Sequence, residues 1–274
     1  ADRRKVVGMI EPNYYAGGTN VLAPKSAALK QWADLKGKKV CAVQGAYYNR
    51  RVTQLYSPDL VVFPAVPEAL NALSAALRNE ITRVFTELAN DAETQVVILT
   101  GAGRAFTVGL DLKELGGEKS AVAAISSQDL SSAVTGLKQP IIGAINGYAI
   151  TGGFELALMC DFMIASTEAR FADTHARVGV VPGWGLSQRL PRLIGANRAK
   201  ELSLTGNYLD AQTAYDWGLV NRVVAPEELL PTCQKLARDI VSTEPVTRGE
   251  IKRLIDAGWH GTLADGLATE YEAS

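Results

Sequence analysis

The chain has 274 residues, of which 47% are hydrophobic and 21% are charged, so it can bury a sizeable core in one or two domains. Its formal net charge of -1 argues against a protein that binds nucleic acid through its charge. The charge is uneven: residues 1–67 carry ten Lys/Arg and four Asp/Glu, whereas residues 68–274 carry eighteen and twenty-five. The sequence holds no apolar run of roughly 18 residues, so we expect no membrane span.

The first 67 residues predict short α/β elements. A strand, a proline turn and a short helix precede the strand "KKVCAVQG" (38–45), and "PDLVVF" (58–63) predicts a further strand. A helix is then expected over 68–91, because six apolar residues recur at three- and four-residue spacing. These residues are Leu70, Leu73, Leu77, Ile81, Val84 and Leu88.

From residue 94 onward, helices and strands alternate. "TQVVILTGAG" (94–103) and "PIIGAINGYA" (140–149) are typical of buried strands, and a weaker helix over 129–139 separates them. Residues 152–166 predict a helix passing into a strand, and 169–185 predict a strand followed by a loop. The remaining elements are a helical stretch over 186–206, a helix, a Gly218 turn and a strand over 210–224, and about forty helical residues at the end. The alternation indicates an α/β fold with a largely parallel sheet or spiral.

The stretch "INGYAITGGFELALMCD" (145–161) predicts a ligand site at a helix N-terminus. Backbone N–H groups there are unpaired and carry partial positive charge, and Gly152 and Gly153 allow close approach of a ligand. Glu155 lies in the first turn of that helix. A second glycine-marked turn, "GAGRAFTVGLDLKEL" (101–115), also follows a strand, so two loops are placed to direct N–H groups at one carbonyl oxygen. The alternative is that Glu155 only stabilises the helix, through the favourable interaction of a first-turn acid with the helix dipole.

Several other kinds of site lack support in the sequence. The GxGxxG, GxxxxGK[ST], GxSxG, HExxH and CxxC motifs are absent, so nucleotide-phosphate cradles and zinc motifs are not indicated. The chain has two histidines and three cysteines, and Cys41, Cys160 and Cys233 lie far apart. We therefore expect reduced thiols, no metal and a cytoplasmic location.

Four segments together resemble the enoyl-CoA hydratase/isomerase (crotonase) superfamily over about 68–274. They are "VVILTGAGRAFTVGLDLKEL", "QPIIGAINGYAITGGFELALMCDFMIAS", "FADTHARVGVVPGWGLSQRLPRLIG" and "LTGNYLDAQTAYDWGLVNRVV". The resemblance implies a spiral of ββα units with a C-terminal helical region, usually assembled as homotrimers or hexamers. It also implies an acyl-CoA substrate, coenzyme A as part of that substrate, and no separate cofactor. By the resemblance, the amides of Leu110 and Gly152 form an oxyanion hole and Glu155 is a catalytic glutamate.

The sequence departs from the family at its second catalytic glutamate. His175, in "FADTHARVG", occupies that position, twenty residues after Glu155. Three readings stay open. His175 acts as general acid or base with Glu155; Asp173, on the same strand face, supplies the missing carboxylate; or the site performs another enolate reaction or binds CoA esters weakly.

The resemblance also implies further substrate-binding residues. Asp111, Leu112 and Lys113 follow Leu110 along the thioester pocket, although Asp111 could equally be a helix cap. Arg104, Ala105 and Phe106 match a loop beside the nucleotide end of CoA. Lys252 matches a basic residue that meets CoA phosphates, with a solvated helix lysine as the alternative. Trp184 lines the acyl pocket or belongs to the core.

Residues 1–67 differ in sequence pattern from the rest of the chain and resemble part of the second lobe of an amino-acid-type periplasmic solute-binding protein. This predicts three regions: an atypical N-terminal α/β fragment (1–67), a crotonase-like spiral core (68–210) and a C-terminal helical and trimerisation region (211–274). The fragment is interpreted as a fusion partner whose strand "DLVVF" replaces a lost strand, or as a divergent extension. The expected function is hydration of a 2-enoyl-CoA. The alternatives are isomerisation or other enolate chemistry, and a catalytically silent chimera.

Overall fold

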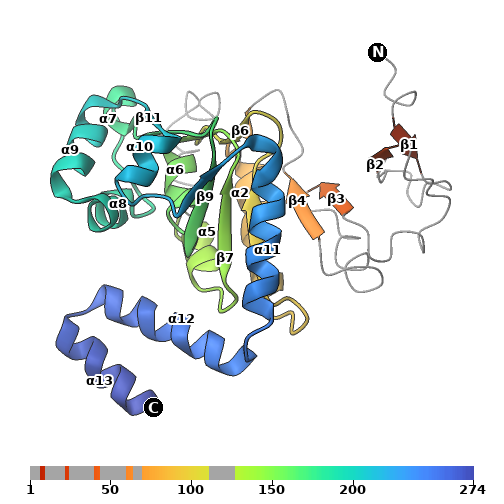
Figure 1. Cartoon of the computed structure of the whole chain (residues 1–274). Coiled ribbons are helices and arrows are strands. Elements are labelled where there is room, and N and C mark those ends of the chain that lie inside the picture. Colours follow the sequence, from red (N-terminus) through yellow and green to blue (C-terminus); the bar gives the residue numbers. More distant parts are fainter. Residues whose placement is uncertain (1–6, 10–21, 25–39, 44–59, 64–69, 111–126) are drawn as a thin grey trace.

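The structure, a computed structural model, describes residues 7–9, 22–24, 40–43, 60–63, 70–110 and 127–274 (Figure 1). The strands are β1 (Val7–Met9), β2 (Leu22–Pro24), β3 (Val40–Val43), β4 (Leu60–Phe63), β5 (Val97–Thr100), β6 (Ala105–Thr107), β7 (Ile141–Ile145), β8 (Tyr148–Ile150), β9 (Phe162–Ser166), β10 (Arg170–Ala172), β11 (Leu209–Asp210) and β12 (Arg222–Val224). The helices are α2 (Ala75–Ala89), α5 (Ser127–Thr135), α6 (Gly152–Ala157), α7 (His175–Val178), α8 (Leu186–Ile194), α9 (Ala196–Thr205), α10 (Ala211–Asp216), the 3₁₀ turn η5 (Pro226–Glu228), α11 (Leu229–Val241), α12 (Pro245–His260) and α13 (Leu263–Ala273).

Two sheets organise the fold. The larger sheet has six strands in the order β12-β9-β7-β5-β4-β3, and all of its neighbouring strands are parallel. The smaller sheet has the order β11-β10-β8-β6, in which only the β10–β11 pair is antiparallel. Short β1 and β2 form a separate antiparallel pair. The α/β class predicted from the alternation of elements is therefore confirmed.

Successive strands alternate between the two sheets, which makes the fold a spiral. The chain runs from β5 to β6, from β7 to β8 and from β9 to β10, each time leaving the larger sheet for the smaller one. Helices α5 and α6 then return it to the larger sheet. Each turn of the spiral is a ββα unit, and the turns stack through parallel strand pairing. The ends of β6 and β8 consequently lie side by side.

Strand β7 shows why the larger sheet is buried on both faces. Ile141 and Ile145 belong to the main apolar core, which also includes Phe85 of α2 and Leu130 of α5. The alternate residues Ile142 and Ala144 face a second apolar cluster. Leu229 and Cys233 of α11 pack against them there, and α11 covers this face of the sheet in Figure 1. Successive side chains of a strand point to opposite faces, so a continuous apolar run matches a sheet with helices on both sides.

The helix expected over 68–91 begins later than predicted. α2 starts at Ala75, with the Ser74 hydroxyl accepting a hydrogen bond from the Leu77 N–H at 3.2 Å. Leu70 and Asn71 lie before it with positive φ angles of 51° and 56°. The apolar spacing continues through this segment, but the segment pairs with another loop: the Leu73 N–H donates to the Gly109 carbonyl at 2.7 Å. Tertiary pairing therefore overrides the helical pattern here.

Three other expectations need refinement. The run 140–149 forms two strands, β7 and β8, separated at Asn146 and Gly147. The loop expected within 169–185 contains the short helix α7. The stretch 186–206 is divided at Gly195, whose φ of 85° ends α8, so that α9 follows as a separate helix.

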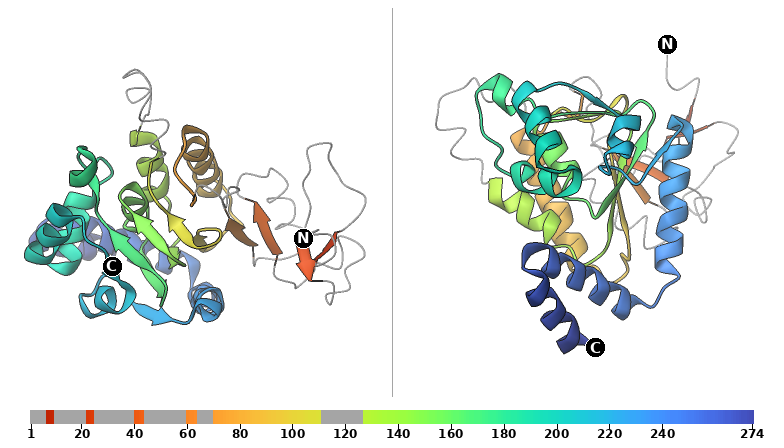
Figure 2. Two further views of the ribbon diagram at one scale, coloured as in Figure 1. Left: turned by 90° about the horizontal axis from the view of Figure 1, so that it is seen from above. Right: turned by 60° about the vertical axis from the view of Figure 1, so that its left-hand side comes forward.

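The last part of the chain is helical, as predicted. Figures 1 and 2 show α12 and α13 side by side at the edge of the two-sheet body. Within the residues that the structure describes, no helix is both long and apolar enough to span a membrane. At the other end of the chain, strands were expected over 38–45 and 58–63, and both are present as β3 and β4. β4 lies beside β5, with Val62 paired to Leu99.

Candidate active site

The N-terminus of α6 is held in an unusual backbone conformation. Thr151, the residue before the helix, has φ 54° and ψ -115°, a region that β-branched residues rarely adopt. Its N–H donates to the Ala172 carbonyl at 2.8 Å, and its hydroxyl is hydrogen-bonded to the Thr174 hydroxyl. These contacts fix the turn from β8 into α6. The Gly152 N–H is the first of the helix and therefore has no acceptor within it.

The loop after β6 approaches this helix end closely. A Cβ added to Gly109 would lie 3.1 Å from the Gly152 nitrogen and 2.8 Å from the Ile150 carbonyl oxygen. A Cβ on Gly152 would lie 3.7 Å from the Leu110 nitrogen. Gly109 also has a φ of 88°, which disfavours any residue with a side chain. The glycine at position 109 therefore lets the backbones at Leu110 and Gly152 lie together.

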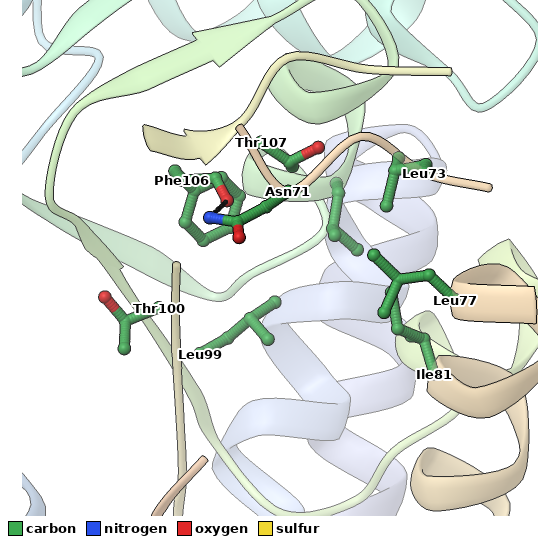
Figure 3. A pocket seen from close by; sticks show the side chains of 9 residues that line it. Asn71, Leu73, Leu77, Ile81, Leu99, Thr100, Phe106 and Thr107 are labelled. Carbon is green, nitrogen blue, oxygen red and sulfur yellow. Dashed lines mark hydrogen bonds between the residues drawn. The ribbon is translucent and has the colours of Figure 1, made fainter. Parts of the chain in front are cut away.

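Two asparagines hold these loops in place. Asn146 Oδ1 accepts from the Gly101 N–H at 3.1 Å, and its Nδ2 donates to the Gly103 carbonyl at 2.8 Å. The buried Asn71 Nδ2 donates to the carbonyls of Ala105 at 2.7 Å and Phe106 at 3.2 Å. Figure 3 shows Asn71 beside Phe106, at the rim of a cavity of about 20 Å³ between α2 and strands β5 and β6. The turn between β5 and β6, and strand β6 that leads to Leu110, are thus anchored to the core.

Glu155 is a buried acid with directed contacts. Its side chain lies in the core of the site at 3% exposure, and a carboxylate there needs partners to offset its lost hydration. Its Oε1 accepts hydrogen bonds from the N–H groups of Trp184 at 2.7 Å and Leu186 at 3.3 Å, at the start of α8. Its Oε2 lies 3.5 Å from Nε2 of His175. Glu155 is therefore a buried acid held by main-chain donors, and not a surface residue of its helix.

His175 lies between two carboxylates. Its Nδ1 is 2.6 Å from Asp173 Oδ1, and its own N–H donates to the same oxygen at 3.2 Å. Burial disfavours the imidazolium, but hydrogen bonds to Asp173 and Glu155 outweigh it and raise the pKa of His175 to about 9. Burial likewise opposes the charge of Asp173, whose hydrogen bonds to His175 and Ser203 nevertheless hold its pKa below the usual value. The arrangement Asp173–His175–Glu155 can hold and pass a proton.

The prediction that Asp173 and His175 share a strand face is wrong. Strand β10 ends at Ala172, and His175 opens α7. Because the chain turns between them, the Asp173 carboxylate meets the Nδ1 side of the ring instead of lying beside Nε2. Asp173 is fully buried at 1% exposure and touches His175 directly. Its carboxylate therefore does not take the place of a second acid facing Glu155.

Trp184 lies against the helix end as well as in the core. It is 5% exposed, and a Cβ on Gly152 would lie 3.3 Å from its ring. Trp184 thus packs in the core beside the start of α6, and its place in an acyl pocket stays a prediction. Its N–H group contacts Glu155, a role that the sequence pattern did not indicate.

A groove of about 530 Å³ runs beside the loop after β6 and along the outer side of the smaller sheet. Its lining residues are Leu70, Arg104, Val108, Tyr148, Ile150, Arg170 and Tyr208. Arg104 was predicted to bind substrate, and its side chain is exposed here. The side chains of Ala105 and Phe106, predicted with it, are buried at 0% and 3%. A ligand in the groove could therefore meet the side chain of Arg104 but not those of Ala105 and Phe106.

The remaining predicted substrate residues fall into two groups. Asp111, Leu112 and Lys113 lie outside the described residues. Lys252 is described, and its assignment to CoA phosphates is not supported, because its Nζ pairs with Asp161 Oδ1 and lies 3.3 Å from Asp256 Oδ2. Asp161 Oδ2 in turn accepts from the Ile141 N–H at 2.6 Å, at the start of β7. The candidate site follows the carboxyl ends of β6 and β8, whereas Lys252 pairs with Asp161 beside the start of β7.

Sequence reasoning missed two contributors to the site. Nothing in the local pattern distinguishes Thr151, whose strained backbone sets the direction of the Gly152 N–H. The Leu186 N–H was also missed, because the residue type does not indicate which backbone N–H groups bind a distant side chain. In the part of the chain that the structure describes, no group of three or more His, Cys, Asp or Glu side chains is placed to hold a metal ion.

Comparison with known proteins places this chain in one family. The sequence model of the family described as "Enoyl-CoA hydratase/isomerase" matches residues 63–273. A relative named "Probable enoyl-CoA hydratase 1, peroxisomal" from Arabidopsis thaliana is 43% identical over 213 residues, covering 75% of this chain and 78% of the relative. The "Short-chain-enoyl-CoA hydratase" of Clostridium acetobutylicum is 40% identical and covers 76% and 81%.

Solved structures agree. An enoyl-CoA hydratase from Bacillus anthracis superposes with a TM-score of 0.74 at 40% identity, over 77% of this chain and 83% of that one. The fold is thus a crotonase-like spiral of ββα units. The chain belongs to the enoyl-CoA hydratase/isomerase family and is an enzyme of that family. The family match begins at residue 63, so the first 62 residues lie outside it.

Proposed function

We propose that the protein hydrates a 2-enoyl-CoA thioester. The observation that carries this proposal is the close approach of Leu110 and Gly152, whose N–H groups come from two separate turns. Among the described residues, neither N–H donates to another backbone group. Two such donors can bind the thioester oxygen and stabilise the negative charge that gathers there when a nucleophile adds to C3. The relatives named as enoyl-CoA hydratases support the choice of reaction.

Glu155 and His175 are proposed to carry the protons of this reaction. Hydration needs one group to take a proton from water and one to deliver a proton to C2. The Glu155 carboxylate and the His175 ring lie 3.5 Å apart, close enough to serve the two carbons of one double bond. The groove beside Arg104 and Arg170 is proposed to receive the phosphates of CoA, because two guanidinium groups border it. No cofactor other than the CoA of the substrate is required.

The replacement Glu155→Gln tests this function. The carboxamide keeps the size of the side chain and can still accept from Trp184 and Leu186, but it cannot take a proton from water. We expect kcat for loss of enoyl-thioester absorbance to fall by about 10²–10⁴-fold with little change in KM. Glu201→Gln, at an exposed position of α9, is the matched control and should retain wild-type rates. Unchanged hydration by the Glu155 variant would rule the assignment out.

Isomerisation of a 3-enoyl-CoA is a second candidate. The observation that favours it is His175 at the place of a second carboxylate, since an imidazole can move a proton between carbons of an enolate without activating water. Supplying 2-enoyl and 3-enoyl thioesters separately distinguishes the reactions. Formation of a 3-hydroxyacyl product supports hydration, whereas interconversion of the two enoyl substrates without hydroxylated product supports isomerisation.

A homotrimer or hexamer is also proposed. Helices α12 and α13 carry large apolar side chains that are well exposed in the single chain, as a surface covered by another copy would be. These residues are Val246, Ile251, Ile255, Trp259, Leu263, Leu267 and Tyr271. Sedimentation equilibrium should give three or six times the monomer mass. A monomer at micromolar concentration would contradict this.

For residues 1–67 we propose a fused fragment of solute-binding-protein type. The start of the family match at residue 63 and the excess of basic residues before residue 68 support a change of origin near this point. Thermal stabilisation by acyl-CoA but not by amino acids would show that only the hydratase-like part retains a ligand site.

A further inference from the structure

His175 has a buried carboxylate on each side of its ring. Nδ1 is 2.6 Å from Asp173 Oδ1, and Nε2 is 3.5 Å from Glu155 Oε2. The ring is 6% exposed, Asp173 is 1% exposed and Glu155 is 3% exposed, so water screens these charges poorly. A second bond, from the His175 N–H to the same Asp173 oxygen at 3.2 Å, fixes the carboxylate relative to the ring.

The acceptors determine where the ring carries its hydrogens. An ionised carboxylate can only accept, so the short contact at Nδ1 requires a hydrogen on Nδ1. In a neutral ring this would leave the Nε2 lone pair directed at the Glu155 carboxylate, an arrangement of two acceptors that repel each other. A hydrogen on both nitrogens satisfies both contacts.

We propose that Asp173 is a positioning residue that holds His175 by Nδ1 with Nε2–H directed at Glu155, so that His175 enters the reaction as the proton donor and Glu155 as the base. This inference rests on the proposed hydratase function and assigns the direction of its two proton transfers. It also gives Asp173 a role other than that of a substitute for the missing acid.

The other charged groups near the ring do not alter this assignment. The charged groups that face His175 are Glu155, from α6, and Asp173, from the segment just before His175. From α9, Ser203 bonds to Asp173 and carries no charge. Arg177, on α7 with His175, directs its guanidinium away, to the Thr205 carbonyl at 2.8 Å and Asn207 Oδ1 at 2.9 Å. Two carboxylates therefore face one imidazole, and the local charge favours its protonated form.

The reaction balances with these roles. Glu155 takes a proton from water as the water oxygen bonds to C3, and the π electrons of the C2=C3 bond move toward the thioester oxygen. The resulting enolate collapses and C2 takes the proton from Nε2 of His175. Glu155 then carries one proton too many and His175 one too few. The 3.5 Å separation of Oε2 and Nε2 allows that proton to return directly and regenerate the starting pair.

NMR titration of the histidine rings tests the protonation independently of activity. The chain has two histidines, and His260 is exposed on α12, so it serves as an internal reference and His260→Gln assigns the signals. We expect His175 to titrate near pH 9 in the wild type. In Asp173→Asn it should titrate lower, toward the ordinary value near 6.5. A wild-type His175 that titrates near 6.5, or an unshifted variant, would overturn the proposal.

Kinetics test the positioning role. Asp173→Asn should lower kcat by about 100-fold with KM nearly constant, and should move the alkaline limb of the kcat–pH profile to lower pH. Asp173→Glu should restore part of the rate and move the alkaline limb part of the way back toward higher pH. Asp239→Asn, at an exposed site of α11, is the control that should change neither. A rate loss in Asp173→Asn with an unmoved limb would indicate a structural role and refute the proposal.

Failure of this inference can be told apart from failure of the proposed function. If the wild-type protein does not hydrate enoyl thioesters, the function fails, and the titration still decides the protonation of His175. If hydration is robust and His175 titrates like a free histidine, the function stands and the assignment of donor and base is wrong. Melting curves for each variant identify any that do not fold, and Asp173→Glu then replaces Asp173→Asn in the comparison.

Discussion

Gly109 lies so close to Gly152, at the N-terminus of α6, that its position has no room for a larger residue. A Cβ at Gly109 would lie 2.8 Å from the Ile150 carbonyl oxygen and 3.1 Å from the Gly152 nitrogen. Because the obstacles are main-chain atoms, a side chain could enter only if one of the loops moved. The spacing of the Leu110 and Gly152 N–H groups therefore depends on a glycine at position 109.

The replacement Gly109→Ala should separate these N–H groups. The methyl group clashes with β8 and the φ of 88° adds strain, so the loop must shift. Loss of one donor to an oxyanion typically costs about 10²–10³-fold in kcat, and we expect a loss in this range for enoyl-CoA hydration.

Gly103→Ala is the matched control for this prediction. Gly103 also has a positive φ, 68°, but a Cβ there would meet nothing within 4 Å. The strain alone should cost about 1–2 kcal/mol of unfolding free energy and leave kcat intact. Equal activity of both variants would show that the Gly109 contact does not set the site.

Asn71 should be important for stability. Its amide donates to the carbonyl of Ala102, in the turn between β5 and β6, and to two carbonyls of β6, and it adopts a φ of 56°. Replacement by Gly removes the hydrogen bonds and should lower the free energy of unfolding by about 1–3 kcal/mol in urea denaturation. Asn71→Ala should be worse by about a further 1 kcal/mol, because alanine disfavours the left-handed conformation. If the two variants are equally stable, the left-handed backbone conformation at position 71 does not contribute to the loss.

Lys252 should matter for folding and not for substrate binding. Lys252→Met leaves the partly buried Asp161 without its ion pair, and we expect a loss of about 1–3 kcal/mol in unfolding free energy. Lys235→Met, which breaks an exposed pair with Asp239, should cost less than about 1 kcal/mol. KM for an acyl-CoA should be the same in both variants and the wild type. A raised KM in Lys252→Met alone would instead support the predicted contact of Lys252 with the phosphates of CoA.

Stability should fall as pH rises through the titration of His175. The pKa of His175 is raised from 6.5 in the unfolded chain to about 9 in the folded protein, so the folded state binds the proton more tightly. This contribution is fully present below pH 6.5 and is lost as the pH approaches and passes 9. Urea unfolding at pH 6.5, 8 and 9.5 measures it, and His175→Gln should flatten this part of the profile. A wild-type profile no steeper than that of the variant would contradict the assignment.

The sequence predicted the spiral and most of its elements because burial on two faces and glycine turns leave local patterns. It also singled out Glu155, since an acid in an apolar helix stands out. The direction of the Asp173 carboxylate was not predictable, because it depends on the turn that ends β10 at Ala172. The partner of Lys252 was missed for the same reason: Asp161 lies 91 residues away in the sequence, and only the fold brings the two side chains together.

Strands β6 and β8 are parallel neighbours in the smaller sheet, and the Leu110 and Gly152 N–H groups lie within three residues of the ends of these strands. Ladder spacing, about 4.8 Å between adjacent strands, brings the two turns together, and the glycine at position 109 lets their backbones approach closely. Under the proposed function, substrate preference could change through the surrounding side chains, while the contact of these N–H groups with the thioester carbonyl would stay fixed by the sheet.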